Sequence, residues 1–355
     1  MPDPQQPTLP PTPARQRVIG LDVARALALI GMVSAHLLAT GGPALTVTDG
    51  FPSALFAVLA GISLALMSDR GVRVGGAALA TSRHSLLVRG LVLILLHQVL
   101  TAVNGPIQVV LEAFGMAYLA MAWMPRWRTR TLWLALAVLA LASGTIHAVI
   151  LTFYPPVPAV LDYPYPLLGW MTYMSVGLLL HRLVLHSPRR QVALLALCAP
   201  VAVAGTLVRE HTALGLPSLL ETQGGIRGVL CLIGDPTSHS AGLADLVTTT
   251  AGSLAVICLC LLLFRHQAWW SFPLQAMGSM SLTVYVAHVA SAGPVMARST
   301  LPSYPLLGWA TIVLALVLPT LLRLRWRRGP LEELMRRLTR IATNPALPPR
   351  SFHHR

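Results

Sequence analysis

The sequence contains no lysine and few charged residues of any kind. Its 355 residues include 26 basic residues, all of them arginine, and 12 acidic ones, so that charged residues make up 11% of the chain. Soluble domains carry about 25% charged residues, whereas 55% of this chain is hydrophobic. The composition therefore excludes an ordinary soluble domain and predicts a polytopic membrane protein.

Cysteine is scarce as well. The four cysteines are Cys198, Cys231, Cys258 and Cys260. None of them forms a CxxC pair, and no histidine-rich ligand set accompanies them, so neither a disulfide framework nor a zinc site is indicated. We therefore expect no bound metal.

Long apolar runs recur along the chain and predict an all-α bundle of about ten transmembrane helices. Each run comes near the length of about 20 residues that a helix needs to cross a bilayer. The expected spans have their cores near residues 18–39, 51–67, 86–103, 107–124, 131–152, 167–185, 192–207, 243–264, 274–294 and 306–322.

The arginines gather in alternate connections between these runs, as the positive-inside rule expects of cytoplasmic loops. This pattern explains the net charge of +14 without a nucleic-acid partner, and it places both termini in the cytoplasm. The protein is thus expected to be a multi-pass protein of the inner or plasma membrane, with membrane lipids as partners. The arginines of the expected cytoplasmic connections and tail are Arg70, Arg73, Arg83, Arg126, Arg128, Arg130, Arg182, Arg189, Arg190, Arg265, Arg323, Arg325, Arg327 and Arg328.

We divide the chain into three parts. Residues 1–17 are rich in proline and glutamine and predict a disordered cytoplasmic tail, and residues 18–325 form the transmembrane domain. Residues 326–355 are a cytoplasmic tail, in which Leu331, Leu334, Met335 and Leu338 form the apolar stripe of a helix. Because arginines lie opposite this stripe, the helix is expected to lie on the membrane surface.

The first apolar run carries charges within the expected membrane span. Asp22 and Arg25 lie three residues apart, which places both side chains on one face of a helix. Since each charge costs about 2.5–3.5 kcal/mol near the centre of a membrane helix, the pair should face protein rather than lipid. It either fixes helix packing near the inner headgroups or belongs to a site.

Five ionisable residues share one depth in the outer part of the expected bilayer. They are His36, His97, Glu112, His147 and His288. Each histidine taken singly is as well explained by an interfacial residue with a satisfied hydrogen bond. Glu112 needs a partner in hydrocarbon, and His97 is the candidate, because the short connection Asn104–Gly105–Pro106 makes their spans antiparallel neighbours. Together the five residues predict a polar cavity that opens outward.

Five segments of the sequence resemble one known family. LDVARALALIGMVSAH at residues 21–36 and DGFPSALFAVLAGISLAL at residues 49–66 resemble the opening helices of the heparan-alpha-glucosaminide N-acetyltransferase family. YPLLGWMTYMSVGLLLHRL at residues 165–183 looks like its middle segment, and GSMSLTVYVAHV with WRRGPLEELMRRL looks like the closing segments of its bacterial branch. The resemblance covers both ends and one middle segment, about half of the chain.

The resemblance implies an integral-membrane acyltransferase that takes an acetyl group from cytoplasmic acetyl-CoA, or another acyl-CoA, and gives it to an acceptor on the far side. That acceptor would be a cell-envelope glycan or lipid. Asp22 and Arg25 would lie at the CoA site. The family has a catalytic asparagine at the outer end of the first helix and a histidine in the next loop. Here His36 occupies the asparagine position, and residues 37–50 contain no histidine.

This departure leaves several roles open. His36 beside Asp49 has the chemistry of a general base or a nucleophile for acyl transfer. Another histidine, such as His239, could instead reach the site, or the chemistry could differ. A proton-coupled secondary transporter that uses His97 and Glu112 is an alternative function, and a non-enzymatic membrane component is a third. A homo-oligomer also stays open.

Overall fold

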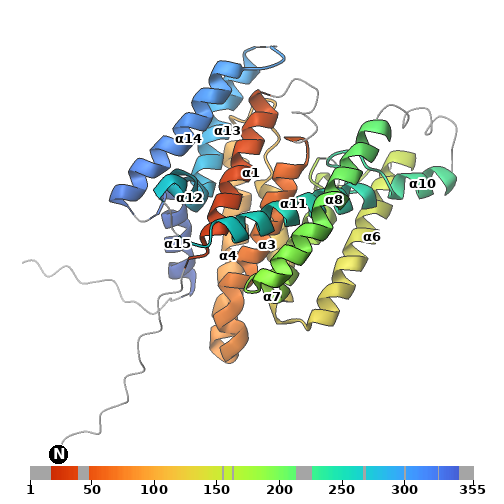
Figure 1. The fold of residues 1–355 in the computed structure, drawn as a ribbon, viewed down its shortest axis with the longest axis horizontal. Coiled ribbons are helices and arrows are strands. Elements are labelled where there is room, and N and C mark those ends of the chain that lie inside the picture. The colour runs from red at the N-terminus through yellow and green to blue at the C-terminus, as the bar shows by residue number, and fades with distance from the viewer. Residues whose placement is uncertain are drawn as a thin grey trace, which may run out of the picture.

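The computed structural model describes residues 17–38, 48–153, 156–161, 164–212, 226–266, 269–299, 301–326 and 328–343. These ranges fold into a bundle of helices and contain no strand, as the sequence predicts. Figure 1 shows α1 near the middle of the bundle, with α12, α13 and α14 on one side and α6, α8 and α10 on the other. Almost all of the expected N-terminal tail lies outside the described residues, and so does the chain after residue 343.

The helices agree closely with the expected spans. Seven helices in the described ranges are long and apolar enough to cross a membrane. They are α1 (Ile19–Leu37), α3 (Phe51–Val74), α4 (Gly76–Leu100), α6 (Thr129–Phe153), α8 (Pro188–Thr212), α11 (Leu243–Leu263) and α14 (Pro305–Arg325).

The other three expected spans are shorter or bent. The helix α5 (Leu111–Ala120) has 10 residues, and α7 (Leu167–Leu183) has 17 and is buried along most of its length. The last expected span before α14 is broken into α12 (Phe272–Ser279) and α13 (Ser281–Ala297), with a bend of 71° between them. A protein-lined interior allows such short or broken helices, because neighbouring helices satisfy the freed backbone groups.

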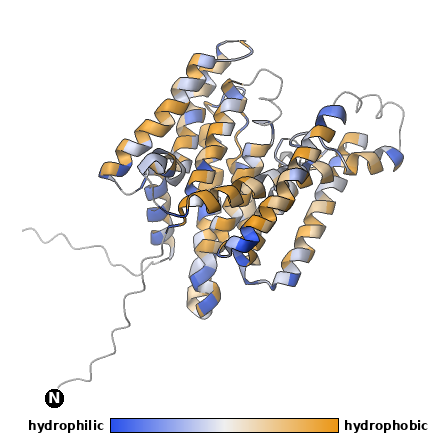
Figure 2. Ribbon diagram, in the orientation of Figure 1, coloured by the Kyte–Doolittle hydropathy of each residue, from blue (hydrophilic) through white to orange (hydrophobic). Residues whose placement is uncertain are grey.

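Two further helices lie outside the expected spans. The apolar segment between α8 and α11 is too short to cross a bilayer, and it forms α10 (Ile226–Ile233), which packs against α6. The predicted amphipathic helix after α14 is α15 (Pro330–Thr343), which buries Met335 against the bundle. Figure 2 shows polar residues on α15 and near helix ends, whereas the sides of α6, α8 and α14 are mainly hydrophobic.

Close helix packing in the core depends on glycine. Gly61 on α3 and Gly177 on α7 lie against each other's helix, and a Cβ at Gly61 would overlap the backbone carbonyl of Met174. Small residues of this kind let two helix backbones approach within a membrane. The contact fixes α3 beside α7, while α1 packs against α3 on its other side.

The two ends of the bundle differ in their charged and polar residues. We call the end where α1 begins the arginine end, because Arg17 and Arg25 lie there. We call the end where α1 stops and α3 begins the histidine end, because His36 and His239 lie there. Both α15 and the first turn of α1 lie at the arginine end, in agreement with the predicted placement of the two termini on one side.

Candidate functional site

A large cavity enters the bundle from the arginine end. It has a volume of about 260 Å³ and is bounded by α1, α3, α4, α5, α12, α13 and α15. The arginines at its wall are Arg17, Arg25 and Arg89, and the side chain of Arg17 is 45% exposed. The cavity therefore reaches the surface beside Arg17, while aromatic and aliphatic residues line its inner part.

The wall of this cavity carries more positive than negative charge. Asp22 is buried and binds both Arg17 and Arg25, the latter through an Nη1–Oδ1 hydrogen bond of 2.8 Å. Arg25 also donates to the hydroxyl of Ser63, at 2.9 Å. The prediction that Asp22 and Arg25 face protein is confirmed. Arg89 adds a further charge, and its buried Nε has no hydrogen-bond partner among the described residues. Such a wall attracts an anionic ligand.

A smaller cavity of about 50 Å³ lies at the histidine end. It is lined by His36 from α1, His239 from the loop before α11, and Thr48 and Gly50 from the segment before α3. His36 Nδ1 lies 3.1 Å from Nε2 of His288, which is buried on α13. Two of the predicted catalytic residues, His36 and His239, thus line one cavity, although they are distant in the chain.

Asp49 lies beside His239 at the edge of this cavity. Its Oδ1 is 3.6 Å from His239 Nε2, and the ring of Tyr165 packs edge-on against the imidazole at 5.8 Å. Burial lowers the pKa of His239; Arg209 lowers it further, and Asp49 acts in the opposite direction. His239 is therefore mainly neutral at physiological pH.

Arg209, near the end of α8, ties the two loops of this cavity together. Its Nε donates to the carbonyl of Pro236, its Nη1 to the carbonyl of Asp49, and its Nη2 to Asp245 at 2.7 Å. Arg209 and Asp245 are 8% and 1% exposed, respectively. The guanidinium fork can hold three acceptors at fixed angles, so this side chain sets the positions of the segments that carry Asp49 and His239.

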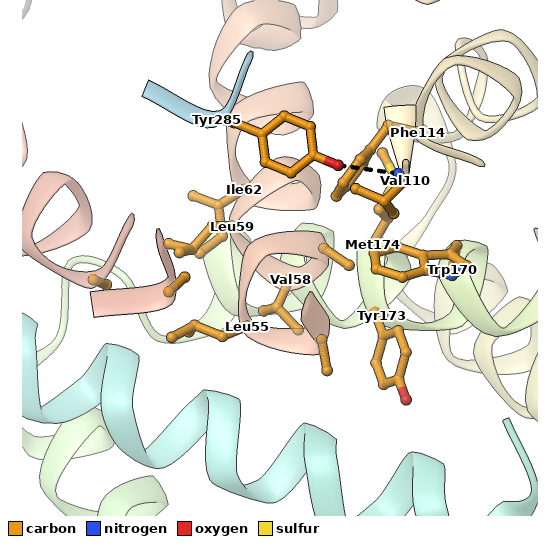
Figure 3. Close-up of a cluster of buried hydrophobic side chains, with 14 of the residues drawn as sticks. Leu55, Val58, Leu59, Ile62, Val110, Phe114, Trp170, Tyr173, Met174 and Tyr285 are labelled. Atoms are coloured by element: carbon orange, nitrogen blue, oxygen red, sulfur yellow. Dashed lines mark hydrogen bonds between the residues drawn. The ribbon is translucent and has the colours of Figure 1, made fainter. Parts of the chain in front are cut away.

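The two cavities are separated by a thin partition. Met32, Val110 and Tyr285 line both of them. The backbone N–H of Val110 donates to the hydroxyl of Tyr285 at 3.2 Å, a bond drawn in Figure 3. Among the described residues, these three are the ones common to both walls, so the two cavities adjoin each other at Met32, Val110 and Tyr285.

The predicted cluster of five ionisable residues divides into separate pairs. His97 and Glu112 pair at 3.3 Å, as their antiparallel spans predict, but Glu112 is 44% exposed and neither residue lines the two cavities. His147 binds Asp235 at 2.8 Å. Hydrogen bonds from His147 and Thr237 outweigh the effect of burial and lower the pKa of Asp235. Only the pair of His36 and His288 belongs to the site, so the expectation of one shared cavity is corrected.

Sequence reasoning missed three residues of this arrangement. Arg89 is one of many arginines, Arg209 lies in a stretch with no recognisable motif, and Tyr285 looks like an ordinary residue of an apolar run. A charged residue inside a span is the signal that would have singled out Arg89. Within the described ranges, no group of three or more histidine, cysteine or acidic residues is arranged to hold a metal ion.

Comparison with known proteins gave two family matches. The family model described as "Heparan-alpha-glucosaminide N-acetyltransferase, catalytic" matches residues 17–214, more than half of the chain. A second model, described as "Protein of unknown function (DUF418)", matches residues 231–342. No curated protein matches the chain. The first match contains His36 and Asp49, and the second contains His239 and His288.

Proposed function

Because the chain belongs to the heparan-alpha-glucosaminide N-acetyltransferase catalytic family, we propose that it moves an acetyl group across the membrane from acetyl-CoA to an acceptor at the histidine end. The family supports a membrane acetyltransferase kind of function. One observation carries the finer proposal: the arginine-lined cavity and the histidine-lined cavity share the partition formed by Met32, Val110 and Tyr285.

The arginine end fits the donor. CoA is polyanionic, and guanidinium groups bind phosphate through paired, charge-assisted hydrogen bonds. Arg89 has a buried Nε without a partner among the described residues, and Arg25 lines the same cavity, where it donates to Asp22 and Ser63. In the proposal, these arginines hold the CoA phosphates, and the apolar part of the cavity takes the acyl-pantetheine arm. By the positive-inside rule, this end faces the cytoplasm of a cell membrane.

The histidine end fits the acceptor. Acyl transfer to an amine or hydroxyl requires removal of a proton from the attacking group, or a nucleophile that carries the acyl group. His36 lines the outer cavity and lies on α1 four residues after Met32, which belongs to the partition. We assign it the role of base or nucleophile. His239 also lines this cavity, with Asp49 beside it, and in the proposal these two residues bind an extracytoplasmic glycan or lipid acceptor.

The reaction balances without a further reactant. The acceptor amine or hydroxyl attacks the thioester carbonyl, its proton passes to His36, and the carbon–sulfur bond breaks. The electron pair of that bond leaves with the CoA sulfur, which then takes the proton. In the covalent variant, His36 first receives the acetyl group and the acceptor then attacks the acetyl-imidazole.

The transporter alternative receives less support. A proton relay through His97 and Glu112 would need these residues in a cavity or pathway. The pair instead lies outside both cavities, and Glu112 is 44% exposed.

The test separates donor binding from chemistry. Purified protein in detergent is given radiolabelled acetyl-CoA and glucosamine, and free CoA and acetylated product are measured for wild type, His36→Ala and Arg89→Gln. We expect His36→Ala to bind acetyl-CoA but to lose at least about 100-fold in turnover, and Arg89→Gln to raise the KM for acetyl-CoA. Glu210, which lines neither cavity, supplies the control variant Glu210→Gln. Wild-type turnover by a folded His36→Ala would contradict the proposal.

A further inference from the structure

The most unusual contact in the site joins two histidines that are 252 residues apart in the chain. His36 Nδ1 and His288 Nε2 lie 3.1 Å apart, and the planes of the two rings are within 7° of each other. His288 is 3% exposed. The contact is therefore a hydrogen bond between nearly coplanar imidazoles, buried among α1, α13 and their neighbours.

We propose that His288 is a positioning residue, which accepts a hydrogen bond from His36 Nδ1–H and leaves His36 Nε2 free to react. The inference rests on the function proposed above for His36. His36 lies within the first family match, at residues 17–214, and His288 lies within the second, at residues 231–342. The inference therefore places residues from both matched segments in one reaction centre.

The argument begins with the two nitrogens of His36. A neutral imidazole has one N–H donor and one lone-pair acceptor. Since Nδ1 is engaged by His288, Nε2 is the nitrogen left for a substrate, and it makes no hydrogen bond to the part of the chain that the structure describes. Both the base and the nucleophile route need a lone pair on Nε2. They therefore require the proton on Nδ1, and this is the tautomer in which His36 donates and His288 Nε2 accepts the hydrogen bond.

The second step concerns the charge that forms during the reaction. When His36 takes the proton of the acceptor, it becomes an imidazolium with an Nδ1–H that points at His288. A neutral imidazole can accept this bond without placing a second charge inside the membrane, where an unpaired carboxylate would be costly. His288 thus supports the charged intermediate and stays neutral before it forms.

His288 lies on α13, beyond the bend that separates this helix from α12. The axis turns by 71° at the break between α12 and α13, and Tyr285 and His288 follow on α13 with a spacing of three residues. That spacing places them on one face of the helix. One face of α13 therefore supplies both the partition between the cavities and the partner of His36.

The experiment compares His288→Phe and His288→Asn with wild type in the turnover assay with acetyl-CoA and glucosamine. The phenyl ring fills the space but accepts no hydrogen bond, whereas the Asn carbonyl can accept one. We expect His288→Phe to lower kcat about 10- to 100-fold with an unchanged KM for acetyl-CoA, and His288→Asn to retain more of the wild-type kcat. Ser291→Ala is the matched control on α13, since within the described residues the Ser291 hydroxyl donates to the His288 carbonyl and makes no other hydrogen bond.

A folded His288→Phe with wild-type kcat would overturn the inference, and so would equal losses in the Phe and Asn variants. If the Phe variant does not fold, His288→Ala with added imidazole decides: restored turnover supports the positioning role, and a low rate that imidazole does not raise refutes it. Failure of the proposed function is a different result, because His36→Ala would then keep wild-type turnover.

Discussion

Replacement of Arg209 should destabilise the protein more than any other single charge removal at the histidine end. The Arg209→Met variant loses three hydrogen bonds and leaves the carboxylate of Asp245 buried at 1% exposure. Of the described partners of its carboxylate, Asp245 would keep the Ala241 N–H alone. Removal of one partner from a buried ion pair costs about 3–5 kcal/mol, and because both side chains are buried, solvent screening does not reduce this figure.

A double variant tests whether the unpaired Asp245 carboxylate causes this loss of stability. If the loss of stability comes mainly from the buried, unpaired carboxylate of Asp245, the double variant Arg209→Met/Asp245→Asn should be more stable than Arg209→Met alone. The expected coupling between the two sites is about 2–3 kcal/mol. Arg209→Lys should fall between wild type and Arg209→Met, because an ammonium retains the charge but cannot reach three acceptors in fixed directions.

The assay is reversible unfolding in detergent, followed by circular dichroism, together with acetyl-CoA turnover of each folded variant. Turnover should fall in Arg209→Met, since the loops that carry Asp49 and His239 lose their common anchor. A loss of less than about 1 kcal/mol in Arg209→Met, the median range of exposed pairs, would refute the reasoning. Additive effects of Arg209→Met and Asp245→Asn would refute it as well.

Three further predictions concern packing, helix capping and pH. Gly61→Ala should destabilise the protein by more than about 3 kcal/mol, because the added methyl group overlaps the Met174 carbonyl. Gly234→Ala is the control, since its methyl group meets an atom 3.5 Å away, at ordinary contact distance. Thermal unfolding of both variants tests this prediction. Glu332→Ala should cost about 1–3 kcal/mol and expose α15 to protease, since this carboxylate accepts two backbone N–H groups and a hydroxyl at the start of α13. Because the pKa of His239 is lowered from 6.5 in the folded state, the unfolded chain binds more protons there, and unfolding free energy should fall as pH drops below 6.5. His239→Gln should make that dependence shallower, and an unchanged dependence would contradict the assignment.

The fold was largely predictable because its main signals are local. Each expected span contains a helix, and the amphipathic stripe of Leu331, Leu334, Met335 and Leu338 predicted α15. The contact between His97 and Glu112 was also predictable, because a short connection joins their helices. The shortness of α5 and the bend before α13 were not, since hydropathy measures the length of an apolar run and not the protein neighbours that permit a break.

The candidate site could be predicted only in part. The resemblance to the family pointed to His36 and Asp49, which lie close together in the chain. The partners of these residues come from distant segments: His288 lies 252 positions from His36, and Arg209 lies 160 positions from Asp49. Tertiary packing alone creates such contacts, and nothing in the local pattern around Tyr285 indicates that it separates two cavities.

The central claim is that an acetyl group passes from acetyl-CoA at the arginine end to an acceptor at the histidine end, with His36 as the base or nucleophile. The most direct measurement uses sealed vesicles that contain glucosamine, with radiolabelled acetyl-CoA outside and the arginine end of the reconstituted protein facing outward. The account predicts labelled acetylglucosamine inside the vesicles with wild type and none above background with His36→Ala. Equal accumulation with both proteins, or CoA release with no labelled product inside, would contradict it.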